Sequence, residues 1–331
     1  MKAIIPVAGA GTRLRPLTYT QPKALIPIAG KTILGFIIDQ LKDAGFNEFV
    51  FIIGYLGEKI EDYVSKKYPD IKAHFIKQDT REGIGHAIWS AKEVIEKDEE
   101  IFIVLGDTIF EAELKEVLKS KYSSLGVKKV DDPRFFGVAE INKDGFIKRV
   151  DEKPKMPKSN LALVGVYYIK ESGQLMEALD YNIKKDVKTI NEFQLTDAIQ
   201  RMLEKGTKFT SFKIGNWYDC GKKEVLLETN ATLLKKMEYA SQDIPMFENT
   251  IIVHPVSIAE GVKISNSIIG PNVTLGENAT IKYGLIKESI IGSYARIEDA
   301  SLHHSVIGSD AYIKGISQSL NIGDNTEIDF S

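Results

Sequence analysis

The sequence is poor in cysteine and contains no long apolar run. Cys220 is its one cysteine, so no intrachain disulfide can form and a multi-cysteine metal site is excluded. No secretory apolar segment follows Met1, and no apolar run approaches the ~20 residues that span a membrane. These absences predict a soluble cytoplasmic protein with no membrane partner.

An excess of charge of either sign is also lacking. The 331 residues include 43 Lys and Arg against 46 Asp and Glu, and the net charge of −3 offers no basic footprint for nucleic acid. Hydrophobic residues make up 43% and charged residues 27%, as in an ordinary globular protein. The chain is long enough to bury a large core, and its length suggests two domains.

A glycine-containing loop follows directly after the first apolar segment. Residues 3–7 read as a short buried strand, and Gly9 and Gly11 follow, where the absence of Cβ lets the backbone approach a ligand closely. Three cations come next: Arg13, Arg15 and Lys23. A tight turn that exposes backbone N–H groups beside cations predicts binding of polyphosphate.

Two familiar phosphate loops do not match this stretch. Leu14 stands where the dinucleotide-binding loop has its third glycine. Gly11, Thr12 and Arg13 stand where the Walker loop has Gly-Lys-Ser/Thr. The loop must therefore be of another kind.

Apolar strands alternate with amphipathic helices through the first third of the chain. Strands are expected at 49–53, 73–76 and 101–105, and helices at 34–44, 60–64 and 84–95. Continuously apolar strands in this alternation predict a parallel sheet covered on both faces. Such a sheet places its ligands at the carboxyl ends of the strands.

Two polar features stand at those strand ends. Asp107 follows the strand at 101–105, and Gln78 opens the loop after 73–76, in which Gly83 lies. We expect both side chains to face the same crevice as the glycine loop. The alternative for Asp107 is an N-cap for a helix at 111–118.

In the second half of the chain the expected strands become shorter and turns more frequent, and the sequence then becomes repetitive. Further strands are expected at 136–141, 146–150, 163–169 and 209–214, and helices at 171–179, 192–203 and 222–237. From Ile252 to Ile313 an aliphatic residue recurs every five or six residues, with glycine directly after several of them. This hexad pattern predicts a parallel β-helix of about four coils, resembling the left-handed triangular kind. We therefore expect domains at 1–240 and 241–331, and the open ends of the β-helix predict a homo-oligomer.

The string GAGTRLRP at 9–16, followed by PKALIP at 22–27, resembles sugar-1-phosphate nucleotidyltransferases, which make NDP-sugars from an NTP and a sugar phosphate. Further motifs occur in the order of that family: LGD, FGV, EKP, VGVY, EFQLTD and WYDCG. The resemblance covers roughly the first 230 residues. It implies an α/β fold with a Rossmann-like, mostly parallel sheet, followed here by the short left-handed β-helix.

The resemblance also implies roles for particular residues. Nucleotide contacts fall on Ala8, Gly9, Ala10, Gly11, Thr12, Arg13, Gln78, Gly83 and Asp107. Sugar-phosphate contacts fall on Lys23, Gly137, Glu152, Lys153, Gly165 and Tyr167. Asp107 and Asp219 would hold Mg²⁺, and the catalytic set would be Arg13, Lys23, Asp107 and Asp219.

The implied reaction is an in-line displacement at the α-phosphorus of the nucleotide. A phosphate oxygen of the sugar phosphate attacks, and pyrophosphate leaves. No general base is needed, because the sugar phosphate is already a nucleophile near neutral pH. The cations and Mg²⁺ must overcome the repulsion between the two anions and hold the reacting groups in line.

Three points stay open at this stage. The first is the nucleotide substrate. Pro6-Val7 resembles enzymes that use UTP, whereas EKPKMPKSN at 152–160 favours thymidylyl transfer to glucose 1-phosphate, so dTTP is slightly favoured over UTP. The β-helix raises the hypothesis of an acyltransferase with His303-His304 as its base, and a non-catalytic regulatory subunit is a further hypothesis. Cys220 is interpreted as a small packed residue.

Overall fold

The structure is a computed structural model that describes residues 1–236, 240–241 and 243–315. The chain divides into two compact units, Met1–Thr229 and a second that begins at Asn230. The boundary falls inside helix α7 (Lys223–Leu234). Because this division cuts a helix, it does not test the domain limits at 240 and 241, which stay a prediction.

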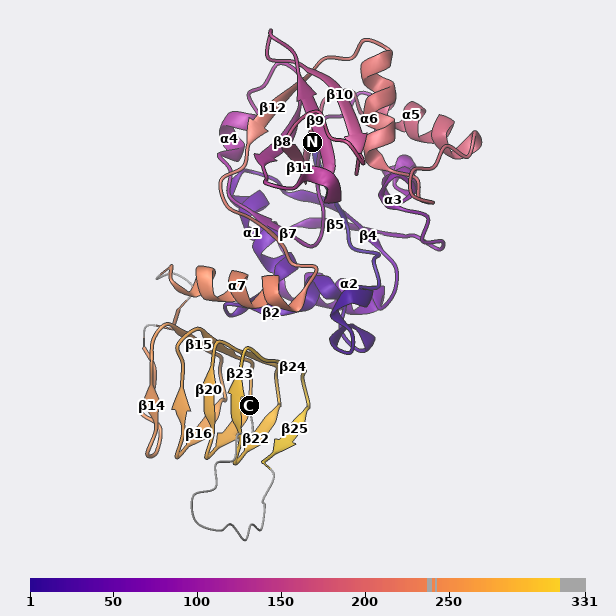
Figure 1. Ribbon diagram of the computed structural model, residues 1–331. Helices are drawn as coiled ribbons and strands as arrows, with labels where there is room; N and C mark the ends of the chain where they lie inside the picture. The colour runs from indigo at the N-terminus through magenta and orange to yellow at the C-terminus, as the bar shows by residue number, and fades with distance from the viewer. Residues whose placement is uncertain (237–239, 242, 316–331) are drawn as a thin grey trace. The chain divides into compact units, whose positions relative to one another are not determined.

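The first unit is built on a nine-stranded sheet in the order β5-β4-β1-β6-β11-β8-β12-β10-β9 (Figure 1). Four neighbours, β5-β4-β1-β6, run parallel, as the alternation of strands and helices predicts, and the sheet becomes mixed from β11 onward. The strands are β1 (Lys2–Pro6), β4 (Glu48–Ile53), β5 (Lys72–Lys77), β6 (Ile101–Val104), β8 (Ser123–Lys129), β9 (Gly137–Ile141), β10 (Ile147–Glu152), β11 (Leu161–Ile169) and β12 (Phe209–Lys213).

Buried side chains alternate between the two faces of this sheet. Ile4, Val50 and Ile103 belong to one core cluster with apolar residues of α3, α5 and α6. Their chain neighbours Ile5 and Phe51 point the other way and are also fully buried. Both faces are therefore covered, as expected. The helices are α1 (Ile33–Asp43), α2 (Gly57–Lys67), α3 (Ile84–Ser90), α4 (Leu114–Val117), α5 (Ser172–Lys184) and α6 (Leu195–Glu204).

Four predicted helices are shorter than expected, and the one expected at 222–237 ends as α7 at Leu234. The segment expected as a helix at 111–118 contains only α4, and before it β7 (Thr108–Phe110) pairs antiparallel with β13 (Trp217–Asp219). The helix expected at 84–95 ends as α3 at Ser90, and only a short 3₁₀ turn continues it. The helix expected from Glu192 begins as α6 at Leu195, because the preceding backbone forms hydrogen bonds with other loops. None of the helices in the described part of the chain is both long and apolar enough to cross a membrane.

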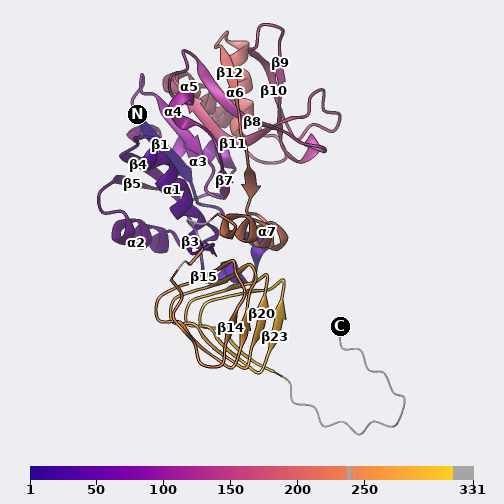
Figure 2. The same ribbon diagram turned by 90° about the vertical axis from the view of Figure 1, so that its left-hand side faces the viewer.

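The second unit contains a left-handed parallel β-helix (Figure 2). Over the described residues 243–315 it has three four-stranded faces, which confirms the prediction of about four coils for that range. Ile264, Ile281 and Ile297 lie in register on successive coils and are at most 6% exposed, so they form an inward aliphatic ladder. The three faces are β14 (Ile251–Ile252), β17 (Ile268–Ile269), β20 (Leu285–Lys287) and β23 (Ser301–His303); β15 (Val256–Ile258), β18 (Val273–Leu275), β21 (Ile290–Ile291) and β24 (Val306–Ile307); and β16 (Lys263–Ser265), β19 (Thr280–Lys282), β22 (Arg296–Glu298) and β25 (Tyr312–Lys314).

Candidate active site

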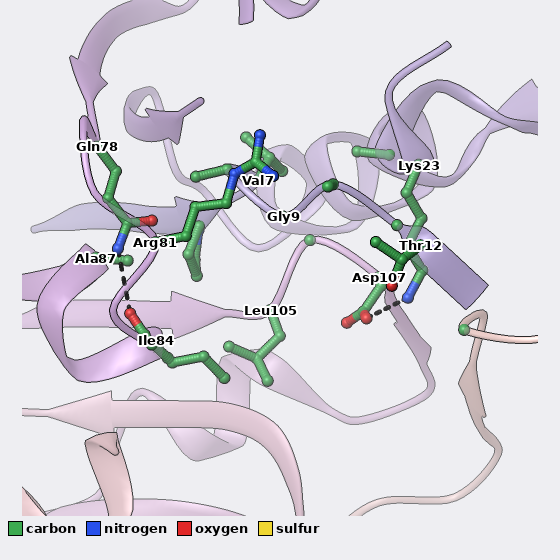
Figure 3. Close-up of a pocket in the computed structure, with 18 of the residues that line it drawn as sticks. Val7, Gly9, Thr12, Lys23, Gln78, Arg81, Ile84, Ala87, Leu105 and Asp107 are labelled. Carbon is green, nitrogen blue, oxygen red and sulfur yellow. Dashed lines mark hydrogen bonds and ion pairs between the residues drawn. The ribbon is translucent and has the colours of Figure 1, made fainter. Parts of the chain in front are cut away.

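The candidate site lies beside strand β1, at the point where the strand order of the sheet reverses. Strand β1 stands between β4 and β6, so the chain first extends the sheet on one side of β1 and later returns to the other. Ligands of open α/β sheets bind at such a switch point. A cavity of about 520 Å³ opens there, large enough for a nucleotide (Figure 3). Its lining includes residues 8–13, Lys23, Gln78, Arg81, Gly83, Ile84, Ala87, Leu105, Asp107, Glu192 and Gly221.

The glycine loop presents its backbone to this cavity. A Cβ at Gly9 would meet no atom within 4 Å, so this position is open to a ligand. Gly11 has φ +60°, and a Cβ there would lie 2.9 Å from Cγ2 of Thr18. The Thr18 hydroxyl donates a hydrogen bond of 2.8 Å to the Gly11 carbonyl. Glycine is therefore required at position 11 to let the loop pack this tightly.

Four charged side chains gather near Lys23; Arg13, Lys23 and Asp107 line the cavity, whereas Asp219 does not. The Lys23 ammonium forms an ion pair with Asp107, and Nζ of Lys23 lies 4.0 Å from Oδ1 of Asp219. Asp219 arrives there because β13 pairs with β7, which places Asp219 opposite Thr108. Arg13 also lies against this group, since a Cβ on Gly221 would be 2.9 Å from its Nη2 and 3.0 Å from Oδ1 of Asp219. The alternative role of Asp107 as a helix cap is wrong, because a strand follows it and its carboxylate pairs with Lys23.

The surroundings of the Asp219 carboxylate shift its pKa. Burial raises the pKa of Asp219, and the nearby charge of Asp107 raises it further, while Lys23 and Arg13 act in the opposite direction. Both carboxylates converge on one cation, the Lys23 ammonium. Hard oxygen ligands that converge in this way fit Mg²⁺, particularly when phosphate oxygens complete the coordination.

Cys220 lies beside these carboxylates without joining their chemistry. Its backbone N–H donates to the Asp107 carbonyl at 3.0 Å. Its side chain is fully buried, and burial raises the pKa of the thiol to about 12. A thiol of this kind is inert at neutral pH, so the interpretation as a small packed residue is confirmed.

Gln78 lies at the other end of the cavity (Figure 3), and Gly83 also lines the cavity. The Gln78 side-chain amide donates to the Gly83 carbonyl at 3.2 Å, and its Nε2 lies 3.1 Å from Nδ1 of His86. Gly83 has φ +105°, and a Cβ there would lie 2.6 Å from the Phe193 carbonyl oxygen. The backbone of Phe193 also hydrogen-bonds to both Glu82 and Gly85. The loop is thus held in a single conformation that only glycine adopts readily.

The residues expected to contact the sugar form a second cluster. Thr196 donates a 2.7 Å hydrogen bond to Oε2 of Glu152, and a Cβ on Gly137 would lie 3.0 Å from the same oxygen. Tyr167 is buried, and its pKa is raised by burial first and then by the charge of Glu152. Nζ of Lys153 lies 3.6 Å from Oε1 of Glu152.

Gly165 connects this cluster to the cavity. The Leu105 N–H donates to the Gly165 carbonyl at 2.9 Å, and a Cβ on Gly165 would lie 2.7 Å from Cδ1 of Leu105. Leu105 itself lines the cavity, whereas Gly137, Glu152 and Tyr167 do not.

Several residues of the site escape sequence reasoning. Arg81 and Glu192 line the cavity, His86 contacts Gln78, and Thr196 holds Glu152. Two signals were available: Arg81 is a cation in the loop that follows Gln78, and Glu192 and Thr196 both lie in EFQLTD.

These features are those of an enzyme that acts on nucleotides. They are a glycine loop, two carboxylates among cations, and an amide at the far end of a cavity large enough for a nucleotide. The sequence model of the family described as "Nucleotidyl transferase" matches residues 2–236. The chain belongs to this family, in its sugar-1-phosphate nucleotidyltransferase branch.

Individual relatives agree with this placement. The chain is 40% identical over 264 residues to "Bifunctional protein GlmU" of Methanocaldococcus jannaschii, covering 79% of this chain but only 61% of that relative. It is 29% identical over 329 residues to "Glucose-1-phosphate thymidylyltransferase" of Streptomyces antibioticus, covering 96% of this chain and 89% of the relative. A solved structure of UDP-glucose pyrophosphorylase complexed with UDP-glucose superposes with a TM-score of 0.63 at 26% identity, over 71% of this chain and 98% of the other.

Proposed function

We propose that the protein transfers a nucleotidyl group from an NTP to a sugar 1-phosphate, with dTTP and glucose 1-phosphate as its substrates and Mg²⁺ as its metal. The observation that carries this proposal is the arrangement of the cavity. Lys23 and Asp107 lie at one end of the cavity and Gln78 at the other (Figure 3). Asp219 lies 4.0 Å from Lys23 without lining the cavity, and Gly83 is hydrogen-bonded to Gln78.

The charged end of the cavity suits the triphosphate. Backbone N–H groups of residues 8–12 and the Arg13 guanidinium would hold the β- and γ-phosphates, which leave as pyrophosphate. Lys23 would lie beside the α-phosphate, where both substrates meet. Mg²⁺ held by Asp107 and Asp219 would supply charge neutralisation on the phosphates.

The amide end of the cavity suits a pyrimidine base. The amide N–H₂ of Gln78 is directed to Gly83 and His86, so the carbonyl oxygen of the same amide faces the cavity. A carbonyl acceptor pairs with the N3–H of thymine or uracil, whereas N3 of cytosine carries no hydrogen. The arrangement therefore favours dTTP and UTP over CTP.

The second cluster suits the sugar. A carboxylate oriented by a hydroxyl, as Glu152 is by Thr196, is a hydrogen-bond acceptor for sugar hydroxyls. Tyr167 and the backbone of Gly137 and Gly165 would shape the pocket around the ring. The Lys153 ammonium would neutralise the sugar's phosphate.

No side chain in this scheme has to accept a proton. The attacking phosphate oxygen is already ionised near neutral pH, and the leaving pyrophosphate is a stable anion. The contribution of the protein is to neutralise charge and to align the attacking oxygen with the bond that breaks. This is why cations and carboxylates, rather than a histidine, occupy the centre of the site.

A pyrophosphate-release panel tests the proposal, with dTTP, UTP, GTP, CTP and ATP against the 1-phosphates of glucose, mannose, galactose and N-acetylglucosamine. We expect the highest kcat/KM for dTTP with glucose 1-phosphate. UTP is the second candidate, since the chain is 26% identical to a UDP-glucose pyrophosphorylase solved with UDP-glucose and carries Pro6-Val7 before the loop. Release with UTP alone would shift the assignment to a uridylyltransferase, and no release with any pair would revive the regulatory-subunit hypothesis.

Two further expectations concern the β-helix. A coenzyme A release assay with acetyl-CoA tests the acyltransferase hypothesis, and we expect no activity above background from about four coils. Self-association through the β-helix stays a prediction, which sedimentation equilibrium tests directly.

A further inference from the structure

The β-helix aligns particular side chains of successive coils at one of its corners. Asn272, Glu288 and His304 follow one another at intervals of 16 residues, and all three adopt left-handed backbone conformations, with φ of 61°, 47° and 47°. Strands β20 and β23 precede Glu288 and His304 on successive coils, and their parallel pairing fixes the register of these two coils. The backbone therefore places the Glu288 carboxylate beside the imidazole of the next coil.

A second imidazole joins them from the adjacent strand. His303 ends β23, where it lies in register with Lys287 of β20. Its Nε2 lies 2.6 Å from Oε2 of Glu288, and Nδ1 of His304 lies 2.9 Å from the same oxygen. The two ring nitrogens are 2.7 Å apart. Three potential ligand atoms thus face a common point, all within 4.8 Å of one another.

An ordinary surface ion pair does not account for this convergence. One imidazole would be enough to pair with Glu288, and exposed pairs stabilise a protein by only ~0–1 kcal/mol. Here two imidazoles direct a nitrogen at the same carboxylate oxygen and at each other, although their side chains are 50% and 61% exposed. Two nitrogens and one carboxylate oxygen with solvent on the open side match a three-ligand site for a transition-metal ion.

The distances are compatible with a metal after a small adjustment. Zn²⁺ bonds to nitrogen and oxygen are ~2.0–2.2 Å long, so tetrahedral ligand atoms lie ~3.3 Å apart. The three atoms must therefore separate by about half an ångström. Exposed side chains allow this by small rotations. The ammonium of Lys287 acts on the Glu288 carboxylate from nearby and would repel a bound cation.

We propose that Glu288, His303 and His304 bind one divalent transition-metal ion of the Zn²⁺ class, which links two successive coils of the β-helix. Imidazole nitrogens favour Zn²⁺, Co²⁺ and Ni²⁺ over Mg²⁺, so this site differs in chemistry from the carboxylates of the candidate active site. The proposal does not depend on the proposed nucleotidyltransferase activity.

The test uses the full chain without a histidine tag, stripped with EDTA and kept in millimolar Mg²⁺ to saturate hard-oxygen sites. Zn²⁺ is titrated calorimetrically, and Co²⁺ is followed by its visible absorption bands. We expect one Zn²⁺ per chain and Co²⁺ bands of a nitrogen-ligated site. H303Q, H304Q and E288Q should each weaken binding at least ~10-fold, the scale of a damaged ligand set.

A matched control comes from His254, an exposed histidine of the same unit outside the cluster. H254Q should bind Zn²⁺ like the wild type. The proposal is overturned if the H303Q/H304Q double variant, shown to be folded by circular dichroism, binds Zn²⁺ as the wild type does. It is equally overturned if H254Q weakens binding as much as H303Q, or if the wild type shows no saturable site.

Discussion

Replacing Lys23 by methionine separates the catalytic role of this residue from its role in the fold. The Lys23 side chain is 13% exposed and contacts both Asp107 and Asp219. Methionine keeps most of the length of the side chain and removes the charge. The variant therefore leaves two carboxylates that share a site without their nearest cation.

The expected losses differ in size. Loss of one preorganised electrostatic contact lowers kcat by about 10²–10³-fold, equivalent to ~2.7–4 kcal/mol in the transition state. Breaking a fully buried ion pair costs ~3–5 kcal/mol of stability, but an exposed pair costs at most ~1. Asp107 is 32% exposed, so we expect an intermediate destabilisation of about 1–2 kcal/mol.

The double variant K23M/D107N distinguishes the two roles. It removes one of the two carboxylate charges that K23M leaves without Lys23, so its thermal midpoint should return part of the way toward the wild-type value. Its rate of pyrophosphate release should stay at or below that of K23M, since neither group is restored. Wild-type kcat in K23M, or recovery of activity together with stability in the double variant, would refute the electrostatic role of Lys23.

Three other substitutions test separate parts of the site and fold. G83A places a Cβ 2.6 Å from the Phe193 carbonyl at φ +105°, so the KM for the nucleotide should rise about tenfold while the KM for the sugar phosphate stays unchanged in steady-state assays. T196V removes the 2.7 Å hydrogen bond to Glu152, and the KM for the sugar phosphate should rise about tenfold with the KM for the nucleotide unchanged. Equal effects on both substrates in either variant would contradict the assignment of two clusters. Hydrogen bonds from Lys72, opposed by burial and aided by His74, lower the pKa of Glu48 from 4.5 to about 2. A carboxyl group whose pKa is lowered by folding stabilises the protein above its unfolded pKa, and the effect is lost as pH falls through the folded value. E48Q should therefore lower the free energy of unfolding, measured by urea titration at pH near 7, by about 1 kcal/mol after screening of the exposed Lys72, and the difference from wild type should vanish toward pH 2. A difference that persists in acid would contradict this origin.

Local sequence patterns were enough to predict the parallel strands of the first unit and the β-helix of the second. The apolar runs of β4 and β6 identify parallel strands because both of their faces are buried. The hexad pattern identifies the β-helix because each coil repeats the phase of the last, as Ile264, Ile281 and Ile297 do. The glycine loop and Asp107 were placed in one crevice because parallel strands share a carboxyl edge.

Long-range pairings could not be predicted in this way. The local sequence of residues 108–110 does not show which segment they pair with, and only their pairing with 217–219 brings Asp219 beside Asp107. The hydrogen bond from Thr196 to Glu152 also joins residues far apart in sequence. Likewise, the hexads show the period of the β-helix but not which residues turn its corners.

The segment from Glu192 to Thr196 joins the two halves of the candidate site. The Phe193 backbone fixes the loop that carries Gly83, and Thr196, three residues later, orients Glu152. For protein engineering this means that nucleotide preference and sugar preference are not independent variables. A library that alters only the base-facing loop leaves its anchor unchanged. One that moves the backbone of the anchor, unlike the side-chain change T196V, is expected to shift both substrates at once, so paired selection is the rational route to a new NDP-sugar.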